Sequence, residues 1–497
     1  MYRWFAGVGK AEMKAQSIGR LIGPLVFAIT AFTAPPAGMP AAAWLVAGLV
    51  VLMAVWWMTE AVPLTVTALL PFVVLPFGNV STARETASTY YSPILFLLLG
   101  GAFIALAIER TGLHKRLSLA ILKAIGSKGG QTQLLLAFMI SAAILSMLIS
   151  NTSTTLIMMP MALAVLAGGE LSSSSEAVGQ QKHSGGLEPV NKEGLSGALP
   201  MGIAFAASIG GLGTLVGSPT NAIAVGLLDT MIGVEITFAQ WTLYGLPIVL
   251  VGVPLAAFII AKFQDVAGHP FDVGAARQAI VGQAEWSRAE RRLIPIVVLT
   301  FLAWMTVPWV KPLLPDGSWT NGTIAIIASF ALFLLPDGTG RPLLVWREAD
   351  RAPWGVIMMF GGGLALAAGM QKSGLALWLG DELLLLENLP LIVVALAVVA
   401  MIIVITEFAS NVATATGIIP VVASLVVALG ADPVLLAMPA ALAASWGFML
   451  PAGTGPNAIA WSTGRIKIER MVGAGLILDI VGIFLIVGMV WGVAALV

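Results

Sequence analysis

Apolar runs of about 17–25 residues recur along the whole chain, and short polar segments separate them. Each run is long enough to cross a hydrocarbon core of about 30 Å as an α-helix. Because backbone polar groups in lipid must be satisfied within the segment, we expect these runs to be helical. The pattern predicts eleven membrane-spanning helices, at residues 20–38, 41–58, 62–80, 93–112, 198–229, 241–262, 291–312, 321–336, 353–373, 434–461 and 472–496.

Two further apolar stretches, 131–168 and 389–428, do not fit a simple span. Each carries polar residues at its midpoint, SNTSTT in the first and SNVATAT in the second, but no charged loop. Two spanning helices would need a turn in water at that point. The sequence therefore predicts two re-entrant hairpins, which enter the membrane and return on the same side.

The composition agrees with a membrane protein. Hydrophobic residues make up 58% of the 497 residues and charged residues only 10%, against about 25% in ordinary soluble domains. The net charge is zero and cysteine is absent, so neither a nucleic-acid partner nor a disulfide framework is indicated. The three histidines fall in segments expected to be polar loops, which leaves no histidine-based metal cluster in the membrane.

The placement of basic residues predicts the orientation. With the N-terminus in the cytoplasm, all but three of the 25 Lys and Arg residues fall inside, as the positive-inside rule requires. The three exceptions are Arg84, Lys311 and Lys372. We therefore expect a multi-pass protein of the cell (inner) membrane, with a cytoplasmic N-terminus and the C-terminus outside.

The chain also repeats itself. GGAFIALAIERTGL at 100–113 aligns with GGLALAAGMQKSGL at 362–375, SN at 150–151 with SN at 410–411, and GSPTN at 217–221 with GTGPN at 453–457. The hairpins enter from opposite sides, so the repeats are inverted, as is typical of secondary transporters with sites at the repeat interface. The predicted division is 1–92 and 241–352 as scaffold, 93–240 and 353–471 as the two transport repeats, and 472–497 as a C-terminal helix.

Four Gly-rich polar interruptions at 146–154, 210–221, 406–416 and 451–457 carry the candidate chemistry. Gly and Pro release backbone groups there, and such groups are tolerated at membrane depth only when they are buried or line a cavity. Carbonyl, hydroxyl and amide oxygens suit a small cation, and helix N-termini suit a carboxylate. No Arg or Lys lies in these stretches, so cations would have to compensate a bound anion.

At these residues the chain resembles the divalent anion:sodium symporter family, the INDY-like di- and tricarboxylate transporters. The similarity covers nearly the whole chain. Its strongest blocks are WWMTEAVPLTVTALLP (56–71), SNTSTT (150–155), SIGGLGTLVGSPTN (208–221), TEFASNVATAT (406–416) and SWGFMLPAGTGPNAIAWSTG (445–464). The resemblance implies a homodimer with a fixed scaffold and a mobile transport domain that moves as an elevator. It also implies two or more sodium sites and no organic cofactor.

The resemblance further implies the roles of individual residues. The substrate-binding set is Ser150, Asn151, Thr152, Ser218, Pro219, Ser410, Asn411, Val412, Thr454 and Gly455. The sodium set is Ser146, Ser150, Asn151 and Gly217 in the first repeat and Thr406, Ser410, Asn411 and Gly453 in the second. Two positions depart from the family pattern, since Val412 replaces a threonine and Gly455 replaces the usual proline.

We therefore expect a non-enzymatic protein, a sodium-coupled symporter of C4-dicarboxylates such as succinate, malate or fumarate. Alternatives of the same fold are a sodium-independent dicarboxylate exchanger and a sodium-coupled citrate or sulfate carrier. An intramembrane hydrolase would need a base near Ser150 or Ser410, and no His or Lys is expected there. Two carboxyl groups within the membrane have other roles to consider. Glu407 suits either a structural or a functional role, and Asp479 is expected to bond a neighbouring helix.

Overall fold

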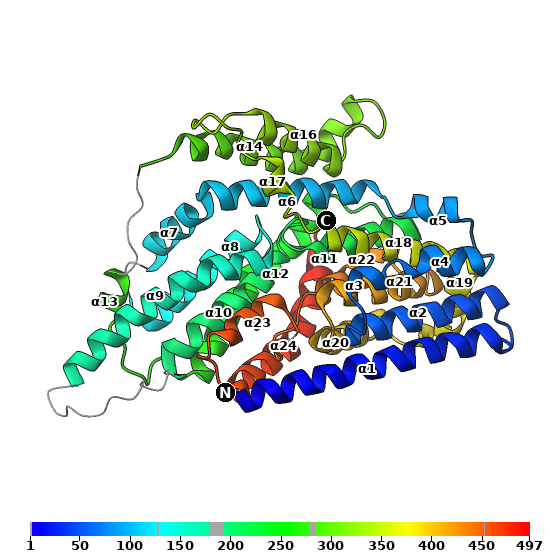
Figure 1. Ribbon diagram of the computed structural model, residues 1–497, viewed down its shortest axis with the longest axis horizontal. Coiled ribbons are helices and arrows are strands. Elements are labelled where there is room, and N and C mark those ends of the chain that lie inside the picture. Colours follow the sequence, from blue (N-terminus) through cyan, green and yellow to red (C-terminus); the bar gives the residue numbers. More distant parts are fainter. Residues whose placement is uncertain (1, 127–128, 178–191, 279–284, 452) are drawn as a thin grey trace.

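The computed structural model describes residues 2–126, 129–177, 192–278, 285–451 and 453–497. These residues form helices, with no β-strand among them (Figure 1). By length and composition, ten helices in the described ranges can cross a membrane, or eleven when one bent pair counts as a span. The predicted all-α membrane fold is thus confirmed.

The chain begins with a helical hairpin of α1 (Tyr2–Phe32) and α2 (Ala41–Thr59). Close packing is possible because Gly48 faces Thr30, whose hydroxyl oxygen would lie 1.8 Å from an added Cβ. The predicted first span, 20–38, is wrong at its C-terminal end. The helix stops at Phe32 because Pro35 and Pro36 cannot continue it, and Gly38 turns the chain at φ +81°.

The next segments are more broken than predicted. The expected span 62–80 is divided into α3 (Leu64–Thr67) and α4 (Leu70–Phe77). Helix α5 (Ala83–Thr89) and the long α6 (Pro93–Thr111) follow. The segment after α6, expected to be a loop, is the amphipathic helix α7 (Leu113–Gly126). His114 is therefore buried in a helix, with its Nδ1 3.0 Å from the Ile108 carbonyl oxygen.

Both predicted hairpins are present as helix pairs that break at the expected residues. The first consists of α8 (Gln131–Ser146) and α9 (Asn151–Ala177), and the second of α20 (Leu391–Phe408) and α21 (Asn411–Ala428). Each new helix starts at the asparagine of its SN pair, because the preceding serine acts as the helix N-cap.

The predicted spans 198–229 and 434–461 are both interrupted helices. The first is divided into α10 (Gly194–Gly211) and α11 (Pro219–Ile232), and the second into α22 (Pro433–Ala443) and α23 (Gly455–Ser462). The repeats interlock through these elements, since α11 packs against α21 and α23 packs against α9. All four hairpin and interrupted-helix breaks are thereby brought to the centre of the molecule (Figure 1).

The remaining helices surround this centre. Helix α14 (Arg288–Met305) and α15 (Val307–Val310) bend by 66° at Thr306, because Pro308 has no N–H to continue the ladder. The other elements are α12 (Phe238–Phe263), α13 (Val273–Gln278), η1 (Lys311–Leu313), α16 (Asn321–Leu334), α17 (Trp346–Ala349), α18 (Trp354–Ser373), α19 (Leu375–Leu383), η2 (Leu384–Asn388) and α24 (Ile468–Ala494).

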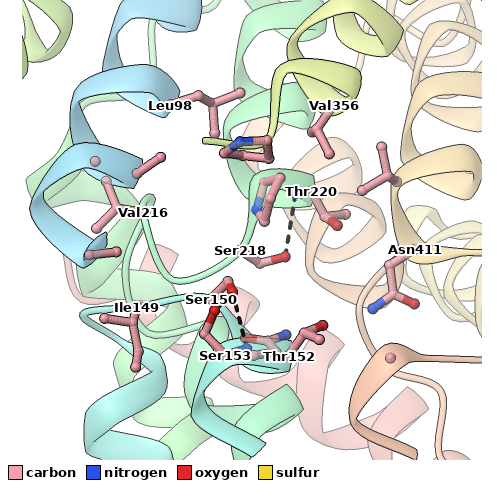
Figure 2. Close-up of a pocket in the computed structure, with 18 of the residues that line it drawn as sticks. Leu98, Ile149, Ser150, Thr152, Ser153, Val216, Ser218, Thr220, Val356 and Asn411 are labelled. Atoms are coloured by element: carbon pink, nitrogen blue, oxygen red, sulfur yellow. Dashed lines mark hydrogen bonds between the residues drawn. The ribbon is translucent and has the colours of Figure 1, made fainter. Parts of the chain in front are cut away.

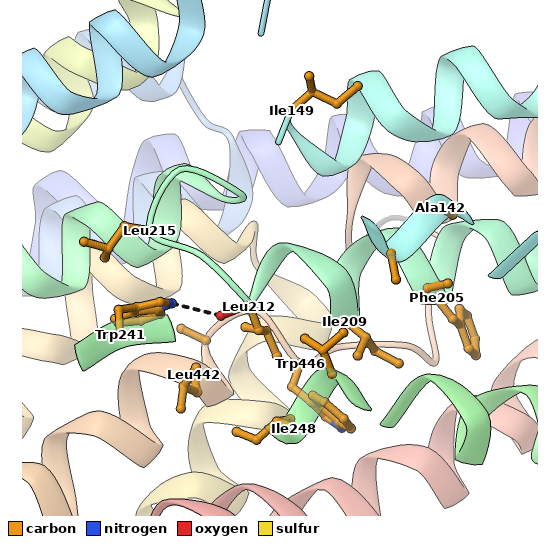
Figure 3. Packing of buried hydrophobic residues seen from close by; sticks show 14 of the residues in the cluster. Ala142, Ile149, Phe205, Ile209, Leu212, Leu215, Trp241, Ile248, Leu442 and Trp446 are labelled. Carbon is orange, nitrogen blue, oxygen red and sulfur yellow. Dashed lines mark hydrogen bonds between the residues drawn. The ribbon is translucent and has the colours of Figure 1, made fainter. Parts of the chain in front are cut away.

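The core of the molecule lies around α10, which is buried along its whole length. Trp241 of α12 packs there and donates its indole N–H to the Leu212 carbonyl, 2.9 Å away (Figure 3). Trp446 does the same toward α24, donating to the Leu478 carbonyl at 3.1 Å. Trp241 thus holds the first interrupted segment by its backbone, whereas Trp446 lies in the second interrupted segment and anchors it to the backbone of α24.

Candidate functional site

A cavity of about 550 Å³ lies where the four breaks meet (Figure 2). All ten residues of the predicted substrate-binding set line it. Residues 150–152 and 410–412, which are far apart in the sequence, share its wall. Of the predicted sodium residues, Ser146, Gly217 and Thr406 do not line the cavity, and Ser146 and Thr406 are completely buried.

Four helices begin at this cavity, and a hydroxyl side chain caps each one. Ser150 accepts from the N–H of Ser153 at 3.3 Å, and Ser410 from that of Ala413 at 3.2 Å. Ser218 and Thr454 cap α11 and α23 in the same way. Helix N-termini carry free N–H groups and about half a positive charge, so the four together favour an anion.

Positive side chains are nearly absent from the cavity wall. Among the described residues that line it, Arg351 is the only Lys, Arg or His. Its side chain is about half exposed, and its guanidinium lies 3.4 Å from the carboxylate of Glu109, which also lines the cavity. Helix ends, amides and hydroxyls, rather than basic side chains, therefore provide the attraction for an anion at the centre.

Behind the first tip lies a cluster of oxygen atoms. Asn151 Oδ1 is 2.7 Å from Ser146 Oγ, and the Ala207 and Gly217 carbonyl oxygens lie 3.2 and 3.1 Å from the same position. An amide oxygen faces two carbonyl oxygens stably only when a cation lies among them. Without a cation, the amide turns over and the two hydrogens of its N–H₂ group point at these oxygens, with the Ser146 hydroxyl and the Ala207 and Gly217 carbonyls all within reach. This donor set fits sodium, which prefers hard oxygen ligands.

The second tip repeats the arrangement in part. Thr406 occupies the position of Ser146, and its hydroxyl lies 3.0 Å from Asn411 Oδ1 and 2.9 Å from the Ala444 carbonyl oxygen. The matched pairs, Ser146 with Asn151 and Thr406 with Asn411, thus make the same contact in both repeats. Fewer oxygen atoms are therefore available to a cation at the second tip than at the first tip.

Two further asparagines, which are not in the predicted site set, hold the interrupted loops. Asn221 Nδ2 donates to the carbonyls of Gly211 and Thr214 at 2.7 and 2.8 Å. Asn457 Nδ2 donates to the corresponding carbonyls of Gly447 and Leu450 at 3.5 and 3.1 Å. The signal was present in the sequence, because both asparagines end the repeated blocks GSPTN and GTGPN.

Comparisons with known proteins agree with this architecture. The family model for the sodium:sulfate symporter transmembrane region matches residues 14–497. A relative named sodium-dependent dicarboxylate transporter SdcS, from Staphylococcus saprophyticus subsp. saprophyticus, is 36% identical over 496 residues, covering 97% of this chain and 93% of the relative. The protein of the same name from Staphylococcus aureus (strain USA300) is 37% identical over 489 residues, covering 97% and 92%.

A solved structure has a similar fold. The YdaH transporter of Alcanivorax borkumensis superimposes with a TM-score of 0.53 at 12% sequence identity, covering 88% of this chain and 97% of that chain. At this level of identity the likeness concerns the fold alone.

Proposed function

Because this chain belongs to the sodium:sulfate symporter family, as the match over residues 14–497 shows, we propose that it is a sodium-coupled symporter of C4-dicarboxylates. Succinate, malate and fumarate are the expected substrates. The names of the SdcS relatives support sodium and a dicarboxylate over sulfate. The observation that carries the proposal is the convergence of four hydroxyl-capped helix N-termini on one cavity without a basic side chain at its centre.

The proposed binding mode uses the two halves of the cavity for the two ends of the substrate. One carboxylate is bound by Ser150, Asn151, Thr152 and Ser218, with Pro219 beside it. The other is bound by Ser410, Asn411 and Thr454, with Val412 and Gly455 in place of bulkier or more polar partners. The N–H groups at the helix starts stabilise negative charge without the desolvation cost of a buried lysine or arginine.

Coupling to sodium follows from charge. A dianion in a low-dielectric site with no cationic side chain beside it is strongly disfavoured unless cations bind nearby. We place sodium at Ser146, Ser150, Asn151 and Gly217, and at Thr406, Ser410, Asn411 and Gly453. Asn151 and Asn411 then belong to both sets, so that sodium binding orients the amide that the substrate meets. If three sodium ions accompany one dianion, each 100 mV of membrane potential adds about 2.3 kcal/mol of driving force.

Alternating access is proposed to follow an elevator mechanism in a homodimer. The scaffold would comprise 1–92 and 241–352, and the moving body the two transport repeats, 93–240 and 353–471. With the N-terminus in the cytoplasm, Glu60, Glu109 and Arg351 lie at the cytoplasmic end, so the cavity they line opens inward. The two ion pairs Lys311–Glu235 and Lys372–Glu85 then lie at the outer face.

The test is uptake of labelled succinate, citrate and sulfate into proteoliposomes, with an inward sodium gradient or with choline in its place. We expect succinate uptake that requires sodium and increases with an inside-negative potential. Succinate uptake that is unchanged in choline would exclude the proposal, and sodium-free counterflow would indicate an exchanger. A preference for citrate or sulfate would be compatible with the fold but would contradict the proposed C4-dicarboxylate substrate.

Two substitutions test the site itself. Asn151→Ala and Asn411→Ala should each abolish sodium-driven uptake. Ser329→Ala is the control, because Ser329 is buried like Asn151 but lies in α16 and bonds its own helix, at the Ala325 carbonyl. Full activity in both asparagine variants would show that the substrate and sodium do not bind at these two residues.

A further inference from the structure

A second cavity, of about 310 Å³, borders the first hairpin tip and lies outside the proposed transport site. Leu148 of the tip loop lines it, whereas the next residue, Ile149, lines the substrate cavity. The rest of its wall comes from the end of α6, from α7, and from α14 with the preceding Trp286. We call it the α7–α14 groove. Its volume lies at the lower end of the range of about 300–1,000 Å³ that is usual for ligand pockets.

The wall of the α7–α14 groove is hydrophobic. Apart from His114 and Arg116, the described residues that line it have hydrophobic side chains. Both polar side chains are already engaged within the protein. His114 Nδ1 lies 3.0 Å from the Ile108 carbonyl oxygen. Arg116 Nε donates to Glu290 Oε1 at 2.7 Å, and its guanidinium lies 4.3 Å from the centre of the Trp286 ring. Apolar cavities of this kind stay dry and take up apolar groups.

The groove opens onto an exposed apolar side of α14. Val298 and Trp286 both line the groove, and they are 49% and 44% exposed, so the groove can be reached from outside. Leu299 and Leu302 of the same helix are 64% and 55% exposed. An exposed apolar surface on a helix that can cross the membrane is the kind of surface that acyl chains contact. A lipid chain can therefore enter the groove from the side without crossing water.

One end of the groove is basic. Helix α14 begins with the residues RAERR and continues with an apolar sequence, so its first turn lies where charged residues give way to hydrocarbon-facing ones. Arg291 precedes Ile294 by three residues and Val298 by seven, which places it on the groove face of the helix. Arg291 is exposed, and it forms no ion pair among the residues that the structure describes. Its charge is therefore available to a ligand at the groove.

The surroundings of the groove are positively charged as well. Helix α7 and the segment 285–292, which both border the groove, together carry six Lys and Arg residues and two Glu residues. One of these acids, Glu290, is already paired with Arg116. Each basic residue at a membrane surface favours an anionic headgroup by about fivefold. An apolar groove with such a rim thus matches an anionic lipid better than a zwitterionic one.

We propose that the α7–α14 groove binds an acyl chain of an anionic phospholipid, with the lipid phosphate beside Arg291 and the chain along Ile294 and Val298 toward Leu148. The rise of a helix separates Arg291 from Val298 by about 10 Å along α14, so headgroup and chain contact successive turns. The lipid then lies against the loop that joins α8 to Ser150, on the proposed sodium-binding tip. This site goes beyond the proposed function and does not depend on which anion the protein carries.

The test measures lipid binding to the purified full-length protein by native mass spectrometry, with dioleoylphosphatidylglycerol and dioleoylphosphatidylcholine as probes. The wild type should bind phosphatidylglycerol with a Kd about fivefold lower than that for phosphatidylcholine. Val298→Trp fills the groove and should raise the Kd for phosphatidylglycerol by about tenfold. Leu299→Trp is the matched control, because Leu299 is the next residue of α14 and is exposed but does not line the groove.

A second pair of variants tests the headgroup. Arg291→Gln should raise the Kd for phosphatidylglycerol by about fivefold and leave the Kd for phosphatidylcholine unchanged. Arg347→Gln is its control, because Arg347 is an exposed arginine of α17 that does not line the groove. Since Arg291 is exposed, its variant should fold normally and decides the question even if Val298→Trp does not purify.

Three results would overturn the proposal. Equal binding of the two lipids by the wild type would show that the basic rim does not select the headgroup. An equal loss of binding in Leu299→Trp and Val298→Trp would place the lipid on the outside of α14 instead of in the groove. A changed oligomeric mass in Val298→Trp, with phosphatidylglycerol binding kept, would show that a second copy of this chain covers the groove. None of these measurements involves uptake, so they are independent of the proposed symport.

Discussion

The hydroxyl oxygen of Thr152 fills the space beside Gly455, where an added Cβ would come within 2.6 Å of it. The first residue of α23 is therefore glycine because the first hairpin tip packs against it. The corresponding pair in the other half is Val412 and Pro219 by sequence position. The two departures from the family pattern, Val412 and Gly455, thus fall one in each matched pair.

Gly455→Ala should weaken substrate binding. The new methyl group must displace Thr152, and overpacking of this kind costs about 1–3 kcal/mol. We expect the KM for succinate to rise by roughly tenfold, measured as initial uptake over a range of succinate concentrations at saturating sodium. Gly488→Ala in α24 is the control, because an added Cβ there meets nothing within 4 Å. An unchanged KM in Gly455→Ala would show that the tips do not constrain each other during binding.

Val412→Thr should strengthen binding. Threonine has nearly the shape of valine and would place a hydroxyl at the position that matches Thr152, on the wall of the same cavity. One additional hydrogen bond of about 0.5–1.5 kcal/mol corresponds to a KM that is roughly two- to tenfold lower. Thr152→Val is the reciprocal variant and should raise the KM. If both exchanges leave succinate uptake unchanged, neither hydroxyl position faces a carboxylate.

Much of the architecture could be predicted from the sequence, because the signals were local or repeated. The SN pairs mark hairpin tips since a serine followed by a helix is a strong N-cap pattern. The repeated blocks at 217–221 and 453–457 identify the interrupted helices, and the structure places them around the same cavity as the tips. Repetition of matched blocks in the same order therefore indicated three-dimensional neighbours that no single motif could have given.

The failures have physical causes as well. The amphipathic α7 was missed because its apolar run is short and basic residues interrupt it, so that hydropathy alone favoured a loop. The breaks within 62–80 were missed because Pro63, Pro71 and Pro76 permit helix on their C-terminal sides. The bonds from the backbone N–H groups of Met449 and Leu450 to the Glu407 carboxylate could not be predicted, because they depend on how the interrupted segment packs against α20.

Asn221 and Asn457 give a prediction for the loops. Each amide donates to two carbonyls of its interrupted segment, which fixes the backbone next to a proposed sodium site. Asn221→Ala and Asn457→Ala should raise the half-saturating sodium concentration more than the KM for succinate, by roughly tenfold for the buried bonds that are lost. Asn388→Ala, an exposed position outside the cavity, is the control. A larger effect on succinate than on sodium would assign these residues to the substrate instead.

A charged cluster at the start of α10 and α24 gives a pH prediction. Glu193 pairs with Lys467, Arg470 and His269, and its Oε2 lies 2.9 Å from His269 Nε2. The bonds from His269 to the Asp265 carbonyl and to Glu193 raise the pKa of His269 above its ordinary 6.5. The bonds from Lys467 and His269 lower the pKa of Glu193 from 4.5 to about 2.

The signs of these shifts define two pH windows for stability. The contribution of His269 is complete below pH 6.5 and is lost as the pH rises through its elevated folded-state pKa. The contribution of Glu193 is present above pH 4.5 and is lost as the pH falls toward about 2. We therefore expect the Tm of the detergent-purified protein to fall as the pH rises above about 6.5, and His269→Gln to reduce that slope. Glu193→Gln should reduce it as well, since it removes the partner of the imidazolium. A slope that persists in both variants would assign the pH dependence to other groups.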